Sequence, residues 1–214
     1  VAKAVGKVAA LHEAAAARWP EAATATVGIA HTRWATHGPP SVANAHPHLD
    51  DDGRIALVHN GIIENYLALK NHLQQRGRTF RSETDTEVLV QLIASCYEGD
   101  LVQATAAALK QVEGTFGIAV LCRDEPGRLV VARRGSPIVI GLGGDETIVA
   151  SDVSALVAYT NRVVYLDDGD IAVLTPGGAD LRTIDNIPVS REIAHIDWDT
   201  AAAEKGGHEH FMLK

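Results

Sequence analysis

The sequence is short of sulfur and aromatic side chains: its 214 residues include two cysteines and one methionine, and aromatic residues make up 5%. Two cysteines are too few for a disulfide framework, so we expect Cys96 and Cys122 to be reduced and buried. The sequence contains no apolar stretch near the roughly 20 residues needed to cross a bilayer, and no signal-peptide pattern precedes the first helix. We therefore expect a cytoplasmic protein with no membrane partner.

Long runs of lysine and arginine are also missing, and the net charge is −8. This charge balance argues against nucleic acid as a partner. Hydrophobic residues make up 46% and charged residues 21%, which is typical of a globular domain that buries a core. The composition predicts one soluble domain with a possible tail.

The first half of the sequence has both helical and strand patterns. Apolar residues at helical spacing predict helices over 4–18, 60–77, 82–99 and 101–114. Alternating patterns predict strands over 24–35 and 54–60, which frame the polar loop 36–53. In the third helix, Ser82 or Thr84 is the expected cap.

From Thr115 onward the pattern is almost wholly that of strands. Turn signals separate the expected strands at hairpin spacing and favour antiparallel meanders; the strands span 115–124, 128–135, 137–143, 146–152, 162–169 and 170–178. Helices covering antiparallel sheets give an α+β fold. After Pro188 the sequence is polar and irregular, which is typical of a linker.

Three short segments carry the polar residues that suggest chemistry. The segment "GIAHTRWATHG" contains Arg33, whose guanidinium can pair with two carboxylate oxygens, although a surface arginine is the ordinary alternative. In "HNG", the Asn60 amide and the Gly61 N–H suggest an oxyanion hole, but this tripeptide is also a common turn. Asp85 in "SETDTE" suits a helix cap or an ammonium group of a ligand.

Taken together, these segments resemble the glutaminase domain of the glucosamine-6-phosphate synthase family, which are class II glutamine amidotransferases. The resemblance rests on "GIAHTRWATHG", "NAHPH", "VHNGIIEN" and "SETDTE", and on the later "ARRGSPIVIGLG" and "ASDVSAL". It covers nearly the whole sequence. It implies an N-terminal-nucleophile hydrolase type fold, a four-layer αββα sandwich of antiparallel sheets.

The resemblance also implies roles for individual residues in binding glutamine. Arg33 would pair with the α-carboxylate and Asp85 with the α-ammonium group. Thr36 and His37 would line the pocket, and His46 would lie in the neighbouring loop. No metal or organic cofactor is implied.

For hydrolysis, the resemblance implies that Asn60 and the Gly61 N–H hold the oxyanion and that Trp34 guards the passage of ammonia. The family's nucleophile is an N-terminal cysteine whose own α-amine accepts the thiol proton. Since an internal cysteine has no such amine beside it, we expect neither Cys96 nor Cys122 to take that role.

The resemblance further predicts how this chain is organised. We expect residues 1–188 to be an N-terminally incomplete glutamine amidotransferase domain, lacking its first strands and inactive alone. Residues 189–214 would lead toward a sugar-isomerase domain. There the ammonia would be passed to fructose 6-phosphate to make glucosamine 6-phosphate, and the intact protein would be a homodimer.

Several alternatives stay open at this stage. The chain could be related to glutamine phosphoribosylpyrophosphate amidotransferase, which shares the fold, or could be a degenerate module that binds glutamine as a sensor. The "HPH" and "HEH" segments could supply metal ligands, but they lack the further ligands of a closed zinc site, so we expect solvated loop histidines. The glycines of "GLGGDE" favour a β-turn over a dinucleotide site.

Overall fold

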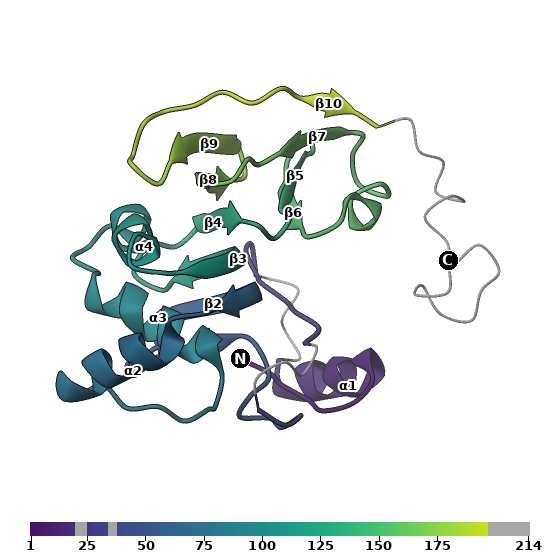
Figure 1. Cartoon of the computed structure of the whole chain (residues 1–214). Coiled ribbons are helices and arrows are strands. Elements are labelled where there is room, and N and C mark those ends of the chain that lie inside the picture. The colour runs from purple at the N-terminus through teal and green to yellow at the C-terminus, as the bar shows by residue number, and fades with distance from the viewer. Residues whose placement is uncertain (20–24, 34–37, 197–214) are drawn as a thin grey trace.

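The structure is a computed structural model that describes residues 1–19, 25–33 and 38–196. Trp34, Thr36 and His37 lie outside these residues, as do the histidines of "HEH". The described chain forms two antiparallel sheets, four α-helices and a 3₁₀ turn, shown in Figure 1. The expected α+β class with antiparallel meanders is confirmed.

The larger sheet has six strands in the order β1-β2-β3-β4-β8-β9. Its longest pairing joins β2 and β3 along nine residues in antiparallel register, from Ile55 opposite Cys122 to Ile63 opposite Gly114. The strands are β1 (His48–Leu49), β2 (Ile55–Ile63), β3 (Gly114–Cys122), β4 (Leu129–Arg134), β8 (Asp170–Thr175) and β9 (Gly178–Thr183).

The smaller sheet has four strands in the order β10-β7-β5-β6. Within the described residues one 3₁₀ turn, η2, spans Val153–Ala155, and Leu156 next to it packs with Val139 and Val163. The strands are β5 (Val139–Leu142), β6 (Thr147–Ala150), β7 (Arg162–Tyr165) and β10 (Ala194–His195).

Three helices cover one face of the larger sheet: α2 (Tyr66–Gln75), α3 (Asp85–Ser95) and α4 (Leu101–Leu109) (Figure 1). Helix α3 is the central one, and ten of its eleven residues are buried. Helix α1 (Val8–Arg18) lies apart from these three and has no buried residue. Within the described residues the layers are therefore helices, large sheet and small sheet, with η2 on the outer side.

Two apolar layers hold the larger sheet between its neighbours. Strand β3 shows how: Phe116, Ile118 and Val120 pack against the helices, whereas Ala119 packs against the smaller sheet. Because successive side chains of a strand point to opposite faces, a strand covered on both faces is apolar along its whole length. This explains the continuous apolar run of "FGIAVLC".

Two expectations for the segments that border the cleft are wrong. The segment 25–33 has no strand, although its sequence alternates as a strand does. A strand also needs a neighbouring edge that supplies hydrogen bonds, and this described segment has no ladder partner. The "HNG" segment does not end its strand, because β2 continues through Asn60 and Gly61 to Ile63 and α2 begins only at Tyr66.

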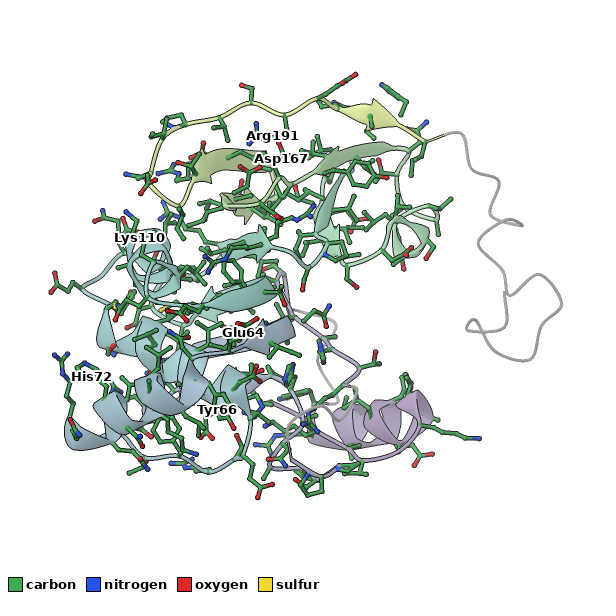
Figure 2. The ribbon with its side chains drawn as sticks, viewed as in Figure 1. Glu64, Tyr66, His72, Lys110, Asp167 and Arg191 are labelled. Carbon is green, nitrogen blue, oxygen red and sulfur yellow. The ribbon has the colours of Figure 1, made fainter. Side chains whose placement is uncertain are left out.

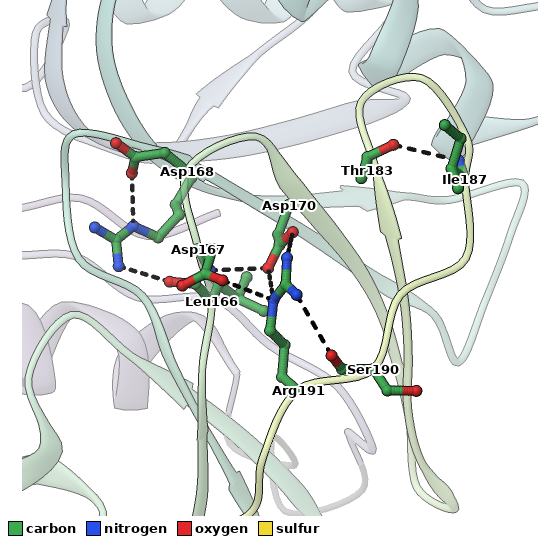
Figure 3. Close-up of polar contacts among 9 residues, drawn as sticks. Leu166, Asp167, Asp168, Asp170, Thr183, Ile187, Ser190 and Arg191 are labelled. Carbon is green, nitrogen blue, oxygen red and sulfur yellow. Dashed lines mark hydrogen bonds and ion pairs between the residues drawn. The ribbon is translucent and has the colours of Figure 1, made fainter.

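The chain after β9 crosses from the larger sheet to the smaller one (Figure 2). Val189 N–H donates to Leu181, and β10 then pairs with β7. Figure 3 shows the contact that fastens this segment: the Arg191 guanidinium donates to both carboxylate oxygens of Asp170, at 2.8 and 2.7 Å. Residues 189–196, expected in a linker, thus pack on the domain, while the domain boundary itself stays a prediction.

Candidate functional site

The five described residues that the sequence singled out as site residues line one small cleft. The cleft has a volume of about 130 Å³, and its lining includes Arg33, His46, Asn60, Gly61 and Asp85. These residues come from three separate segments: the stretch before β1, strand β2 and the start of α3. Arg33 and Asp85 are 52 positions apart in the sequence, so it is the fold that brings these residues together.

Strand β2 places Asn60 and Gly61 at the cleft. Val58 packs between the two sheets, so Asn60, two residues on, lies on that same face. Gly61 has φ +128, and a Cβ at this position would clash with the carbonyl oxygen of Thr115. Only glycine fits here, because an L-residue rarely adopts this backbone conformation and the neighbouring strand leaves no room.

Asp85 is the first residue of α3 and is 4% exposed. Thr84 is the N-cap, and its side chain accepts a hydrogen bond from Glu87 N–H. The Asp85 carboxylate accepts from the Ile63 N–H at 2.9 Å, so it joins the helix to the end of β2. A carboxylate at a helix N-terminus is also stabilised by the helix dipole.

The loop before α3 is held by a buried carboxylate that sequence reasoning missed. Glu87, 4% exposed, accepts from the backbone N–H of Arg81 and Ser82 at 2.8 and 2.6 Å. The Ser82 hydroxyl donates to the same carboxylate. On the next loop, Asn44 accepts from the Glu83 N–H at 3.0 Å. These bonds fix the loop that presents Asp85.

Arg33 comes from the segment before β1, which is distant in the sequence from Asn60 and Asp85. Its side chain is half-buried, and Nη2 donates to the Gly38 carbonyl oxygen at 3.3 Å. The cleft therefore holds one guanidinium from Arg33 and one carboxylate from Asp85. A cation and an anion in one small cleft match the two charges of an amino-acid zwitterion.

The histidines of "HPH" are not solvated, which corrects the sequence-based expectation. His46 and His48 are 8% and 3% exposed. The His31 and His46 rings have centroids 4.1 Å apart, and those of His46 and His48 are 5.1 Å apart. His48 Nε2 lies 3.1 Å from the Thr84 hydroxyl. The loop thus turns inward, where His46 borders the cleft and its ring contacts those of His31 and His48.

Burial sets the charge of these imidazoles. It lowers the pKa of His31 and of His46, where the neighbouring imidazoles act in the same direction. Burial, with Lys3 nearby, lowers the pKa of His48 to about 3. The three histidines are therefore neutral at pH 7, which allows close stacking without charge repulsion.

Both cysteines lie far from the cleft along the elements that build it. Cys122 stands opposite Ile55 on β2, and Gly117 opposite Asn60, so about 17 Å of strand separates Cys122 from the Asn60 position. Cys96 follows the end of α3, about 16 Å along the helix from Asp85. Both thiols are free, and only Cys122 is fully buried. The expected burial is thus confirmed for Cys122 and is only partial for Cys96.

Two kinds of feature are absent from the part of the chain that the structure describes. Among residues 1–19, 25–33 and 38–196, no group of three or more His, Cys, Asp or Glu side chains is placed to hold a metal ion. Over the same ranges, none of the helices is long and apolar enough to span a bilayer.

The fold and the cleft together define a class: an α+β domain with two antiparallel sheets that gathers a cation, an anion and an amide beside strand β2 of the larger sheet. The family model of the glutamine amidotransferase domain matches residues 8–176. The chain belongs to the glutamine amidotransferase domain family.

Within that family, several similar curated proteins are named glutamine–fructose-6-phosphate aminotransferase (isomerizing). The glutamine–fructose-6-phosphate aminotransferase (isomerizing) of Symbiobacterium thermophilum is 54% identical over 188 residues, which is 88% of this chain and 31% of that protein. Its namesake from Aquifex aeolicus is 49% identical over the whole chain and 36% of its own length. The chain therefore spans about a third of the length of these relatives.

Among solved structures, the glutamine phosphoribosylpyrophosphate amidotransferase from B. subtilis, complexed with ADP and GMP, has a TM-score of 0.61. It is 26% identical, and the match covers 72% of this chain and 34% of that one. This likeness confirms the expected N-terminal-nucleophile hydrolase type fold.

Proposed function

We propose that this chain is the glutamine-hydrolysing part of an isomerizing glutamine–fructose-6-phosphate aminotransferase. The observation that carries the proposal is the meeting of Arg33, Asn60, Gly61 and Asp85 in one cleft. The sequence predicts each of these residues as a site residue because of its chemistry. A chance meeting of an arginine, a carboxylate and an amide donor would not explain why the predicted residues are the ones that line the cleft.

In this proposal the two charged side chains recognise the amino-acid end of glutamine. Arg33 pairs with the α-carboxylate, because its planar guanidinium offers two parallel N–H donors. Asp85 accepts from the α-ammonium group, and its bond to Ile63 N–H holds the carboxylate in place. Thr36 and His37 complete the pocket by resemblance, and His46 supports it from below.

Asn60 and Gly61 act on the other end of the substrate. Attack on the side-chain amide carbon turns the carbonyl oxygen into an anion, which the Asn60 Nδ2 and the Gly61 N–H stabilise as donors. Ammonia leaves, and water then releases glutamate. By family resemblance the attacking group is an N-terminal cysteine, a residue that these 214 residues do not contain at their start.

Ammonia then passes Trp34 to a sugar-isomerase domain, toward which residues 189–214 lead, and there fructose 6-phosphate is converted to glucosamine 6-phosphate. The intact protein works in the cytoplasm as a homodimer. The identity of 49% to 54% with aminotransferases of that name supports this acceptor over the phosphoribosylpyrophosphate acceptor, whose enzyme is 26% identical.

The test is to assay the full-length protein with glutamine and either sugar phosphate. Glutamine with fructose 6-phosphate should yield glucosamine 6-phosphate and glutamate in equal amounts, and phosphoribosylpyrophosphate should be inert. Glutamine binding without any turnover would favour the sensor alternative instead.

A further inference from the structure

The Asn60 side chain has two different ends, and only one of them can serve an oxyanion. The amide nitrogen carries two donors, whereas the amide oxygen only accepts and would repel a developing negative charge. The amide can turn by half a rotation about its last bond. A neighbour must therefore keep the nitrogen toward the cleft.

His31 is that neighbour. Its Nε2 lies 2.8 Å from Asn60 Oδ1. Because an amide oxygen cannot donate, the hydrogen of this bond belongs to His31 Nε2. A turned amide would direct its own N–H groups at that hydrogen and lose the bond. His31 also borders the cleft, so the contact lies at the site.

We propose that His31 is a positioning residue that orients the Asn60 amide by donating from Nε2, which leaves Nδ2 facing the oxyanion position. The inference rests on the proposed role of Asn60 in glutamine hydrolysis. It assigns a task to a residue that the sequence motifs alone did not distinguish.

The His31 ring is itself held in place. It lies against His46 at 34° between ring planes, and His46 Nδ1 accepts from the backbone N–H of His59 at 3.4 Å. His59 directly precedes Asn60 on β2, so the same stretch of strand anchors both ends of the arrangement. Because burial lowers the pKa of His31, the ring carries one hydrogen, and its bond to Asn60 requires that hydrogen on Nε2.

A double-mutant cycle in the full-length protein tests the positioning role. The variants are His31→Leu, Asn60→Ala and the pair, with His72→Leu on the exposed side of α2 as the matched control (Figure 2). His31→Leu should lower kcat for glutamine hydrolysis by about 10- to 100-fold, up to the usual cost of losing one oxyanion donor. KM should change by less than about 3-fold, because the charged contacts remain.

In the Asn60→Ala background, His31→Leu should cost less than about 2-fold more, because the group it orients is already gone. The inference would be wrong if the double variant lost kcat by the product of the two single losses, or if His31→Leu left kcat unchanged. Either result would leave the proposed function standing. An unchanged kcat in Asn60→Ala would instead remove Asn60 from the oxyanion hole, which is a failure of the proposed function.

A second measurement needs no variant. Nitrogen-15 NMR of the His31 ring should show a hydrogen on Nε2 and none on Nδ1 at pH 7. A hydrogen on Nδ1 alone would contradict the inference.

A conservative variant gives a third test. His31→Gln, whose side-chain amide can still donate to Asn60, should recover part of the lost kcat. A kcat of His31→Gln no higher than that of His31→Leu would count against the inference.

Discussion

The carboxylate of Asp85 accepts a hydrogen bond from the backbone N–H of Ile63, which couples the start of α3 to the end of β2 at 2.9 Å. Both halves of the proposed site depend on this contact, because Asp85 is the expected ammonium ligand and β2 carries Asn60 and Gly61. The bond turns two segments that are distant in sequence into one rigid edge of the cleft.

The first prediction concerns the charge of Asp85. Asp85→Asn keeps an oxygen that can accept from Ile63 but removes the negative charge, so glutamine should bind at least about 10-fold more weakly. Asp100→Asn is the control, because Asp100 caps α4 and asparagine is an equally good cap. Calorimetric titration with glutamine measures both. Equal affinity in the Asp85 variant would remove this residue from ammonium binding.

The second prediction concerns the shape of the Arg33 side chain. Arg33→Lys keeps the positive charge but replaces two parallel donors by a point charge, so kcat/KM for glutamine should fall by about 10-fold or more. Arg128→Lys is the control, since Arg128 is exposed and pairs with Glu125. Steady-state kinetics of the full-length protein decide the matter, and an unchanged kcat/KM would place Arg33 outside the site.

A third prediction tests the backbone at Gly61. Gly61→Ala should lower the free energy of unfolding by about 2–4 kcal/mol, because the φ of +128 is strained for alanine and its Cβ meets the Thr115 carbonyl. Gly144→Ala is the control, because that position has open space. Urea denaturation followed by circular dichroism measures both, and similar values for the two variants would contradict the strain argument.

The fourth prediction is a pH dependence of stability that comes from His48. Its pKa is about 3 in the fold against 6.5 ordinarily. The His48 imidazole is neutral in both the folded and the unfolded state above pH 6.5. Between pH 6.5 and 3 the unfolded chain binds a proton at His48, whereas the folded protein does not. Stability should therefore fall as pH drops from 6.5 toward 3, by up to about 1.4 kcal/mol per pH unit.

The charged and titratable groups that lower the pKa of His48 are Lys3, Arg33 and His31. The His46 ring lies edge-on to the His48 ring, with centroids 5.1 Å apart, and His48 in turn lowers the pKa of His46. His48→Gln should make the slope between pH 6.5 and 5 shallower without abolishing it, because burial also lowers the pKa of His31 and His46, whereas the exposed His72→Gln should leave it unchanged. Urea denaturation at several pH values provides the comparison, and a His48→Gln slope equal to that of the parent would show that the buried imidazole contributes nothing.

Much of the fold could be read from sequence, because the strands from β3 to β8 are marked by turn residues and by apolar runs. The strands that were missed have weak signals. Residues 178–183 contain a glycine and two charged residues, and β10 is two residues long. These strands form because they hydrogen-bond to neighbouring strands, β9 to β8 and β10 to β7. Such pairing depends on distant parts of the chain, which local patterns do not encode.

The sequence predicted residues that meet in the cleft but not the contacts that hold them there. Arg33, Asn60 and Asp85 stand in recognisable motifs, whereas the stacked histidines and the Glu87 carboxylate work through contacts with other segments. The polar loop that carries His46 and His48 looked solvent-exposed from its composition. Only the folded chain shows that it turns inward, where the His48 ring bonds to the Thr84 hydroxyl and Asn44 accepts from the Glu83 N–H.

The central claim is that the cleft between β2, the start of α3 and Arg33 binds glutamine as an amino acid, with its amide at Asn60. The most direct test is a crystal structure of the full-length protein with L-glutamate, the expected product. We predict the α-carboxylate on the Arg33 guanidinium, the α-ammonium group on the Asp85 carboxylate, and the side-chain carboxylate beside Asn60 Nδ2 and Gly61 N–H. Glutamate bound outside this cleft, or bound with its side chain toward Arg33, would contradict the account.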